Sequence, residues 1–146
     1  MSQQQKTPAL IDVRGPRFSA TLTVIVLAIA LATQNAWVLA FQAVVFAIGA
    51  IRGPQFTPYA FIFKRVVKPR LRGEVITEDS RPPQFAQTVG FLFALAGLIG
   101  AAIGSAAVFN VAVGFALAAA FLNSVFNYCL GCEMYLLVLR IRTRNN

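Results

Sequence analysis

Long apolar runs alternate with short polar segments along the chain, and this pattern predicts helices that cross a membrane. The runs at 18–33 and 36–51 are uncharged and are separated only by Gln34 and Asn35. Each holds roughly 16 residues, somewhat fewer than the ~20 that a bilayer core requires. Two short helices joined by a tight turn place both amides at the surface, whereas one long bent helix would carry them at its middle. The pattern favours the hairpin.

A third apolar run begins at Phe85 and a fourth ends near Leu139, with a break expected between 104 and 110, where small and polar residues interrupt the bulky ones. Four spans are the most economical interpretation. The predicted fold is therefore all-α, an integral membrane four-helix protein built from two helical hairpins. The predicted parts are an amino-terminal segment (1–17), a first transmembrane hairpin (18–51), a loop (52–84), a second hairpin carrying two cysteines (85–139) and a basic tail (140–146).

The composition supports a membrane protein and excludes several kinds of catalytic site. Hydrophobic residues make up 58% of the chain and charged residues only 12%, against about 25% charged residues in soluble domains. The chain has no histidine, five acidic residues and two cysteines. This inventory excludes histidine-based catalysis and a multi-ligand metal centre within one chain. We therefore expect no cofactor, and a metal ion would need ligands shared across a dimer.

The positive charges define one side of the predicted membrane protein. All 13 basic residues lie in the amino-terminal segment, the central loop or the carboxyl-terminal tail. Short segments rich in lysine and arginine stay in the cytoplasm, and only an even number of spans places all three there. We expect a multi-pass protein of the plasma membrane with both termini and the central loop in the cytoplasm, and with no cleaved signal peptide.

The central loop carries a basic cluster in which large apolar residues stand between the charges. Residues 58–67 read Pro-Tyr-Ala-Phe-Ile-Phe-Lys-Arg-Val-Val, which is typical of a helix lying in the membrane interface against anionic headgroups. Nucleic-acid binding is the alternative for any basic cluster. The neighbouring spans and the aliphatic residues favour lipid, so we expect the bilayer as a partner and no nucleic acid.

A ten-residue motif occurs twice, and each copy introduces a hairpin. The segment Asp-Val-Arg-Gly-Pro that begins at Asp12 recurs as Asp-Ser-Arg-Pro-Pro at Asp79, 67 positions later. The repeat predicts two hairpins in the same orientation, related by a pseudo-axis along the membrane normal. Each motif is suited to starting a helix, because proline fits the first helical turn. The alternative is that Arg14 and Arg81 form a cytoplasmic anion-binding pair.

Glycines and asparagines on the third and fourth runs predict close helix packing. Gly97 and Gly100 lie on the third run, and Gly100 forms a GxxxG pair with Gly104, a spacing that lets helix backbones approach closely in lipid. Asn123 and Asn127 are also four residues apart and are expected to hydrogen-bond across helices. The alternative is a glycine-lined pathway for a small solute through a homo-oligomer.

The strongest candidate for chemistry is a cluster of Cys129, Cys132 and Glu133 near the end of the fourth run. On a continuous helix the two cysteines lie about 60° apart and Cys129 and Glu133 about 40° apart, so all three are predicted to share one face. Two thiols at this spacing can form a disulfide, share a metal ion or pass sulfur from one to the other. The alternative is that both cysteines act only as small apolar residues.

Glu133 is the only charged residue inside an apolar run, and an acid there indicates a functional site. A carboxylate facing the thiols would raise their pKa and accept a proton from them. An ion pair with Arg14, Arg81 or Arg140 is the alternative for Glu133.

The depth of the two thiols in the membrane is open between two alternatives. A continuous fourth span places them in the inner leaflet, near a lipid-soluble electron carrier. A tail along the interface leaves them at the surface, where a cytosolic thiol protein can reach them.

Several segments together carry a resemblance over nearly the whole chain: the two repeat motifs, the stretch Ala120-Phe-Leu-Asn123 and, most specifically, Cys129-Leu-Gly-Cys132-Glu133. With these segments the chain resembles the small bacterial membrane proteins known as domain of unknown function 4395. The resemblance implies four spans in a bacterial plasma membrane. It also implies a link to sulfur metabolism, because family members tend to be encoded beside thioredoxin-like proteins and sulfurtransferases.

The leading functional hypothesis is a membrane-embedded dithiol that exchanges electrons or sulfane sulfur with a thioredoxin-like or sulfurtransferase partner. Cys129 and Cys132 are the predicted exchanging pair and Glu133 the proton acceptor, so the possible enzymatic activity is thiol–disulfide or persulfide exchange. One alternative is an oligomeric transporter or channel for a small sulfur compound or anion, with Arg14 and Arg81 at its cytoplasmic mouth. Another is a non-catalytic accessory or assembly subunit of a membrane complex.

Overall fold

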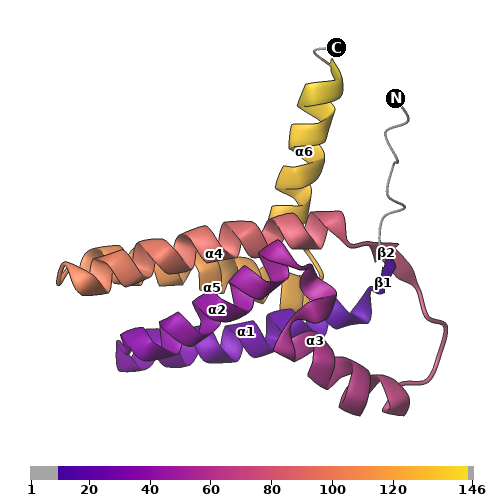
Figure 1. Ribbon diagram of the computed structural model, residues 1–146, viewed down its shortest axis with the longest axis horizontal. Helices are drawn as coiled ribbons and strands as arrows, with labels where there is room; N and C mark the ends of the chain where they lie inside the picture. Colours follow the sequence, from indigo (N-terminus) through magenta and orange to yellow (C-terminus); the bar gives the residue numbers. More distant parts are fainter. Residues whose placement is uncertain (1–9, 145–146) are drawn as a thin grey trace.

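Four helices packed side by side form the body of the protein in the computed structural model, which describes residues 10–144 (Figure 1). Going around the bundle, each helix contacts the next in the order α1, α2, α4, α5. Most of the predicted amino-terminal segment (1–17) and the last two residues of the predicted tail (140–146) lie outside the described residues. The bounds of the bundle helices are α1 Arg14–Thr33, α2 Ala36–Ile51, α4 Arg81–Ala102 and α5 Ala106–Phe126.

The first hairpin turns at the polar pair that interrupts the first two apolar runs. Gln34 ends α1 in the left-handed region at φ 53°, and the side chain of Asn35 accepts a hydrogen bond from the amide of Trp37 (2.9 Å), which caps α2. An asparagine cap satisfies one of the amide groups that a helix leaves free at its start. The predicted pair of short helices is therefore confirmed over the single bent helix.

The second hairpin turns at Gly104 and Ser105, at the beginning of the predicted break. Ser105 caps α5 by accepting a hydrogen bond from the amide of Val108. Gly104 has φ 76°, and a Cβ atom there would have nothing within 4 Å. The packing role predicted for Gly104 is thus wrong: it lies in the turn rather than on α4, where its positive φ favours glycine.

The other two predicted packing glycines lie inside α4 where neighbouring helices come close. A Cβ atom at Gly97 would lie 2.7 Å from Cδ2 of Leu39 on α2, and one at Gly100 would lie 2.7 Å from the backbone nitrogen of Phe109 on α5. Gly100 therefore permits backbone-to-backbone contact, whereas Gly97 meets the end of a flexible side chain.

The apolar character of the bundle fits a membrane environment. Three of its helices, α1, α4 and α5, are long and apolar enough to cross a membrane by length and composition. Helix α2 is apolar but holds only 16 residues. The structure is consistent with a membrane protein, whereas the number of spans and their orientation stay predictions.

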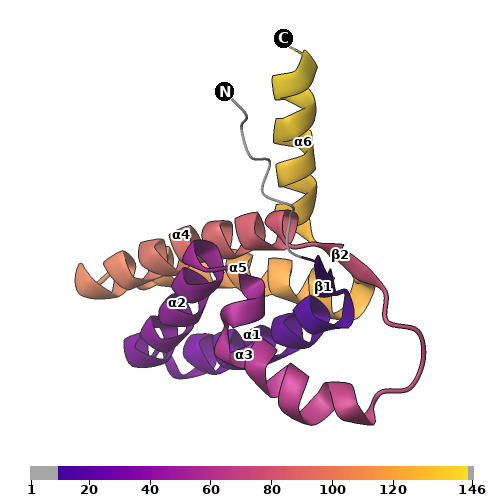
Figure 2. The ribbon, with the colours of Figure 1, turned by 45° about the vertical axis from the view of Figure 1, so that its right-hand side comes forward.

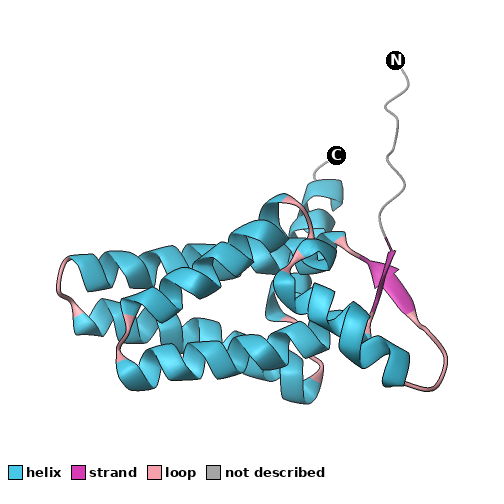
Figure 3. Ribbon diagram, turned by 60° about the horizontal axis from the view of Figure 1, so that its bottom comes forward, coloured by secondary structure: helices cyan, strands magenta, loops and turns pink. Residues whose placement is uncertain are grey.

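The two copies of the repeated motif meet in a small antiparallel sheet. Strand β1 (Leu10–Asp12) pairs with β2 (Thr77–Asp79), and Ile11 lies opposite Glu78 at the centre. Figure 3 shows the sheet beside the end of the bundle at which α1 and α4 begin. Because Ile11 and Glu78 are also 67 positions apart, the pairing register is the one expected if a two-fold axis related the motifs.

Matching contacts extend this relation from the strands into the bundle. Arg17 of α1 donates to the backbone oxygen of Ser124 near the end of α5 (3.0 Å), and Gln84 of α4, 67 positions later, donates to that of Ala50 near the end of α2 (2.8 Å). In both cases a polar side chain binds a carbonyl in the last turn of a helix, where carbonyl groups lack intrahelical partners. The two motifs therefore make equivalent contacts with the two hairpins.

The central loop is helical where an interfacial helix was expected. After the short η1 (Pro54–Phe56), α3 (Pro58–Ile62), η2 (Phe63–Val67) and η3 (Lys68–Arg70) follow one another without a break. Tyr59 and Phe63 are buried, while Phe61 and Val66 are exposed. The guanidinium of Arg65 lies over the Phe61 ring, 4.8 Å from its centroid.

A short polar network within the bundle anchors this segment. The Tyr59 hydroxyl donates to Oε1 of Gln42 on α2 (2.6 Å), and Nε2 of Gln42 lies 3.4 Å from the Thr23 hydroxyl on α1. Gln42 is fully buried, so each of these bonds satisfies a group that would be costly to leave without a partner.

The carboxyl-terminal helix differs most from expectation. The predicted second hairpin ran to residue 139, but α5 ends at Phe126, and α6 (Leu130–Arg144) is a separate helix that projects across the long axis of the bundle (Figures 1 and 2). Asn127 adopts φ 53°, a conformation that asparagine tolerates and that stops a helix. Asn123 and Asn127 were predicted to lie four residues apart on one helix, and this is wrong, because Asn127 ends α5.

Candidate functional site

The two cysteines lie at the start of α6, where the chain leaves the bundle. Cys129 precedes the first helical residue, and its sulfur accepts a hydrogen bond from the amide of Cys132 (3.1 Å). The two sulfurs form a disulfide, with 5.1 Å between the Cα atoms. The prediction that Cys129, Cys132 and Glu133 share one helical face is wrong, because Cys129 lies outside the helix at its cap position.

The same local geometry occurs, with other residues, at the start of α3. The Thr57 hydroxyl accepts a hydrogen bond from the amide of Ala60 (3.2 Å), as the sulfur of Cys129 does from Cys132. The ring of Phe63 then packs at a tilt against Phe18, and that of Tyr135 packs in the same way against the corresponding Phe85, with ring centroids 5.8 and 5.7 Å apart. Three residue pairs share one 72-position offset: Thr57 with Cys129, Ala60 with Cys132, and Phe63 with Tyr135. The 72-position offset is the sequence signal that could have identified Cys129 as a helix cap, and the predictions from hydrophobic pattern did not use it.

Gly131 sets the position of the disulfide against the bundle. A Cβ atom at Gly131 would lie 2.5 Å from both Cα and Cβ of Ala86 on α4. A side chain at this point on α6 would therefore force α6 away from α4. The close approach holds the cysteine-containing turn against α4, and the Phe85–Tyr135 contact continues the same interface.

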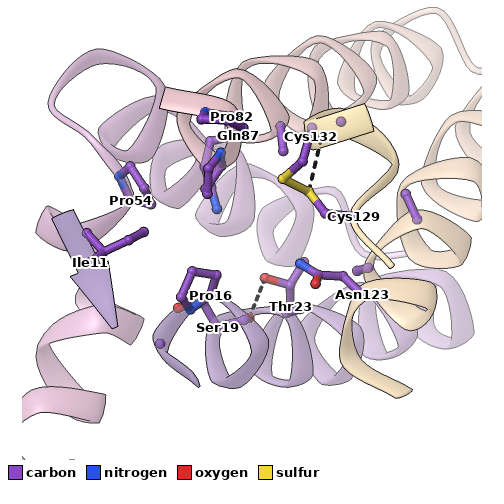
Figure 4. A pocket seen from close by; sticks show the side chains of 18 of the residues that line it. Ile11, Pro16, Ser19, Thr23, Pro54, Pro82, Gln87, Asn123, Cys129 and Cys132 are labelled. Atoms are coloured by element: carbon purple, nitrogen blue, oxygen red, sulfur yellow. Dashed lines mark hydrogen bonds between the residues drawn. A yellow bond between two sulfur atoms is a disulfide. The ribbon is translucent and has the colours of Figure 1, made fainter. Parts of the chain in front are cut away.

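A cavity of about 860 Å³ lies beside the disulfide, between the first turns of α1 and α4. Figure 4 shows Cys129, Cys132 and Gln87 on one side of the space and Pro16, Ser19, Thr23 and Asn123 on the other. Both cysteines are partly buried. The arrangement places a redox-capable bond on the wall of a cavity large enough for a small organic molecule.

The matched family agrees with the resemblance found in the sequence. The model for the family described as Domain of unknown function (DUF4395) matches residues 11–140. The chain belongs to this family. No curated protein and no solved structure matches the chain. Because the family description carries no activity, the function of this DUF4395 protein has to be argued from its site.

Glu133 lies in the first turn of α6 and lines the cavity, but its side chain is exposed. The alternative ion pair with Arg14, Arg81 or Arg140 is not formed: among residues 10–144 the ion pairs are Arg14–Asp12 and Arg81–Asp79. A carboxylate in a first helical turn is stabilised by the helix dipole, which accounts for Glu133 without an arginine partner.

The two arginines predicted to bind an anion are each held by an aspartate of the same motif. Arg14 contacts Asp12 (2.8 Å) and Arg81 contacts Asp79 (2.7 Å), and each aspartate also accepts from the amide of its arginine. These bonds hold the pKa of both carboxyl groups below the usual value. The pairing supports the interpretation of the motif as a helix start, because each guanidinium charge is already compensated.

Glu78 is a carboxylate of the cavity that the sequence pattern did not single out. It lies at the centre of β2, and both burial and the neighbouring Asp79 raise the pKa of its side chain. The available signal was its place in the repeat, since Glu78 occupies the position of Ile11 in the first copy. Within residues 10–144, no three histidine, cysteine or acidic side chains come together to hold a metal ion.

Proposed function

We propose that this DUF4395 protein is a membrane dithiol protein whose Cys129–Cys132 pair exchanges electrons with a cytosolic thioredoxin-like partner. The observation that carries the proposal is the disulfide at the start of α6 on the wall of the cavity. A partly exposed sulfur at a helix start is the setting in which thiolates are stabilised, because the helix dipole and free amides favour negative charge.

The geometry supports different roles for the two cysteines. The amide of Cys132 points at the sulfur of Cys129, so in the reduced protein Cys129 is the thiolate that attacks or leaves. A thiolate of the partner attacks the sulfur of Cys129, a mixed disulfide forms, and Cys132 leaves as a thiolate. The second partner thiol then attacks its own mixed-disulfide sulfur and releases Cys129, so two electrons pass from the partner to the protein.

Sulfane-sulfur exchange with a sulfurtransferase uses the same pair. The Cys129 thiolate takes the outer sulfur from a persulfide of the partner and becomes a persulfide itself, while the partner thiolate is released. Attack by Cys132 on the inner sulfur of Cys129 then forms the disulfide and releases hydrosulfide. This cycle ends on the oxidised pair, which a dithiol must reduce before the next turn.

We further propose that the protein crosses the plasma membrane several times, as two similarly oriented hairpins, with the disulfide at the cytoplasmic surface. The central segment and the start of α6 both lie toward the end of the bundle at which α1 and α4 begin (Figure 1), and both segments carry basic residues. Helix α6 projects across the bundle axis, so it would lie along the interface if the bundle spans the membrane. Most of its large apolar side chains are exposed, with arginines among them near its carboxyl end, which suits an interface with anionic headgroups. These exposed residues are Leu130, Met134, Leu136, Leu137, Val138, Leu139 and Ile141.

Trapping of a mixed disulfide tests the proposed exchange. The variant Cys132→Ser, purified in detergent, is mixed with a thioredoxin-like protein whose reactive cysteine is joined by a disulfide to a small thiol leaving group. We expect a covalent heterodimer through Cys129 that a reductant cleaves. The matched variant Cys129→Ser should form at least tenfold less of this heterodimer, because its remaining thiol, Cys132, does not lie at the cap position of α6. Equal trapping by both variants, or trapping by neither, would refute the assignment.

A further inference from the structure

The cavity beside the disulfide holds a polar group that nothing in the described chain satisfies. Gln87 projects from α4 on the same side as the two cysteines (Figure 4). Its Oε1 atom is buried and has no hydrogen-bond partner among residues 10–144. Gly49 of α2 makes room for this side chain, since a Cβ atom there would lie 2.7 Å from Cγ of Gln87. The oxygen lies against Gly49, where a Cβ atom would be 2.8 Å away, and a half-turn of the amide exchanges the oxygen with the NH₂ group. A buried amide oxygen that lacks a partner is costly, so a bound molecule that hydrogen-bonds to the turned amide would remove a penalty.

The rest of the cavity limits what that molecule can be. The lining is mostly small and apolar, with side chains such as Pro16, Ala20, Pro83 and Phe93. Polar amides and hydroxyls also line it, together with the charged residues Asp12, Lys64, Lys68, Glu78 and Glu133. Its volume of about 860 Å³ lies in the range typical of small-molecule sites. The surrounding bundle is apolar enough for lipid. The mostly apolar lining with a few polar groups favours a ligand that is largely apolar, lipid-soluble and equipped with a few hydrogen-bonding oxygens.

From these observations we infer that the cavity binds a quinone, which reoxidises the Cys129–Cys132 dithiol after a partner has reduced it. The inference rests on the proposed thiol exchange and names the final electron acceptor. An amide donates to a quinone carbonyl through its NH₂ group and accepts from a quinol hydroxyl through its oxygen. Gln87 is thus suited to both oxidation states of such a ligand. A lipid acyl chain would fill the space but would leave the amide without a partner.

Oxidation of the dithiol by the quinone takes two steps within the site and transfers two electrons and two protons. One cysteine thiolate adds to a ring carbon of the quinone and forms a C–S bond. The other thiolate attacks that sulfur, the S–S bond forms, and the C–S bond breaks with its electron pair left on the ring. The two protons lost by the thiols then convert the ring oxygens into hydroxyls, so the dithiol and quinone become disulfide and quinol. Glu78 and Glu133 line the same cavity and can carry these protons.

Stopped-flow oxidation of the reduced protein in detergent tests this inference. The probe is decylubiquinone, the loss of quinone absorbance is followed, and thiols are counted at the end. We expect one quinone consumed per dithiol and a rate that saturates with quinone concentration. The variant Gln87→Leu should raise the half-saturating concentration about tenfold, the loss expected when a hydrogen bond to a buried amide is removed.

Two controls distinguish a quinone site from a lipid-filled cavity and from oxidation of the thiols without binding. The variant Thr88→Val changes the next residue of α4, which does not line the cavity, and should leave saturation unchanged. Added phospholipid should compete weakly, whereas full displacement of quinone by lipid would make the cavity a lipid site and overturn the inference. A rate linear in quinone and equal in wild type and Gln87→Leu would also overturn it.

Reduction by a thioredoxin-like dithiol and oxidation by quinone are measured separately, so a wrong quinone site can be distinguished from a wrong thiol exchange. If a thioredoxin-like dithiol reduces the disulfide but quinone oxidation does not saturate, only the quinone site is wrong. If neither the disulfide nor the dithiol reacts with such a partner, the thiol exchange itself is wrong.

Discussion

The close approach of α6 to α4 predicts that Gly131→Ala displaces the cysteine-containing turn. The added methyl group would lie 2.5 Å from Cα and Cβ of Ala86, whereas ordinary contact begins at 3.4 Å. Relief requires a movement of about 1 Å, and the atoms in the way belong to a helix backbone and its Cβ, which cannot rotate aside. The start of α6 must therefore move away from α4 and carry Cys129 and Cys132 with it.

The magnitude follows from comparison with a glycine in open space. Overpacking a well-packed site costs about 1–3 kcal/mol, while replacing a helical glycine by alanine contributes about 1 kcal/mol of helix stability. Gly114 on α5 provides the matched control, since a Cβ atom there has nothing within 4 Å. Gly114 lies inside α5 and gains the helix preference in full, whereas Gly131 is the second residue of α6 and gains less. Gly131→Ala should therefore be at least about 1–3 kcal/mol less stable than Gly114→Ala.

Unfolding by sodium dodecyl sulfate in mixed micelles, followed by circular dichroism, measures the free energy of unfolding of both variants. The rate at which dithiothreitol reduces the disulfide serves as a second readout. Because the displaced turn leaves the disulfide less covered, reduction should be faster in Gly131→Ala and unchanged in Gly114→Ala. Equal stability and equal reduction rates in the two variants would show that α6 does not pack on α4 as described.

Two further predictions concern residues that hold other segments in place. Tyr59→Phe leaves Oε1 of Gln42 without its donor and should cost about 1–3 kcal/mol at neutral pH. Burial raises the pKa of Tyr59 to about 12, so the wild type keeps its full stability below pH 10 and loses it as the pH rises toward 12. The difference from Tyr59→Phe should shrink over that interval in pH-dependent unfolding, and a constant difference would contradict the assignment. Arg17→Gln removes the hydrogen bonds to the last carbonyls of α5. Amide hydrogen exchange at residues 124–129 should therefore accelerate several-fold. Unchanged exchange would show that Arg17 does not hold this turn.

Much of the bundle could be predicted because local chemistry sets its boundaries. The runs at 18–33 and 36–51 correspond closely to α1 and α2, since Gln34 and Asn35 are both polar and suited to a turn. The helix starts were placed too late: the structure begins α1 at Arg14, four residues before the apolar run. The side chain of Asp12 accepts a hydrogen bond from the amide of Arg14, and satisfying one of the amides that are free at a helix start allows the helix to begin in polar sequence.

The separation of α6 from α5 could not be predicted from hydrophobic periodicity. Apolar residues continue on both sides of Asn127, and one residue in the left-handed region leaves no trace in such a pattern. The consequence for the site is large. A continuous helix would carry Cys129 and Glu133 on one face, whereas the observed break makes Cys129 a helix cap and leaves Glu133 exposed.

The sequence by itself determined that this is an all-helical, membrane-like chain with a repeated helix-start motif and two cysteines three positions apart, because composition, apolar runs and spacing are local properties. Only the tertiary structure decided what the cysteines face. The cavity is built from residues far apart in the chain, such as Ile11, Gln87 and Asn123, and Gly131 matters only because Ala86 of another helix lies against it. Contacts of this kind depend on how helices pack, and no pattern along one helix records which neighbour it will meet.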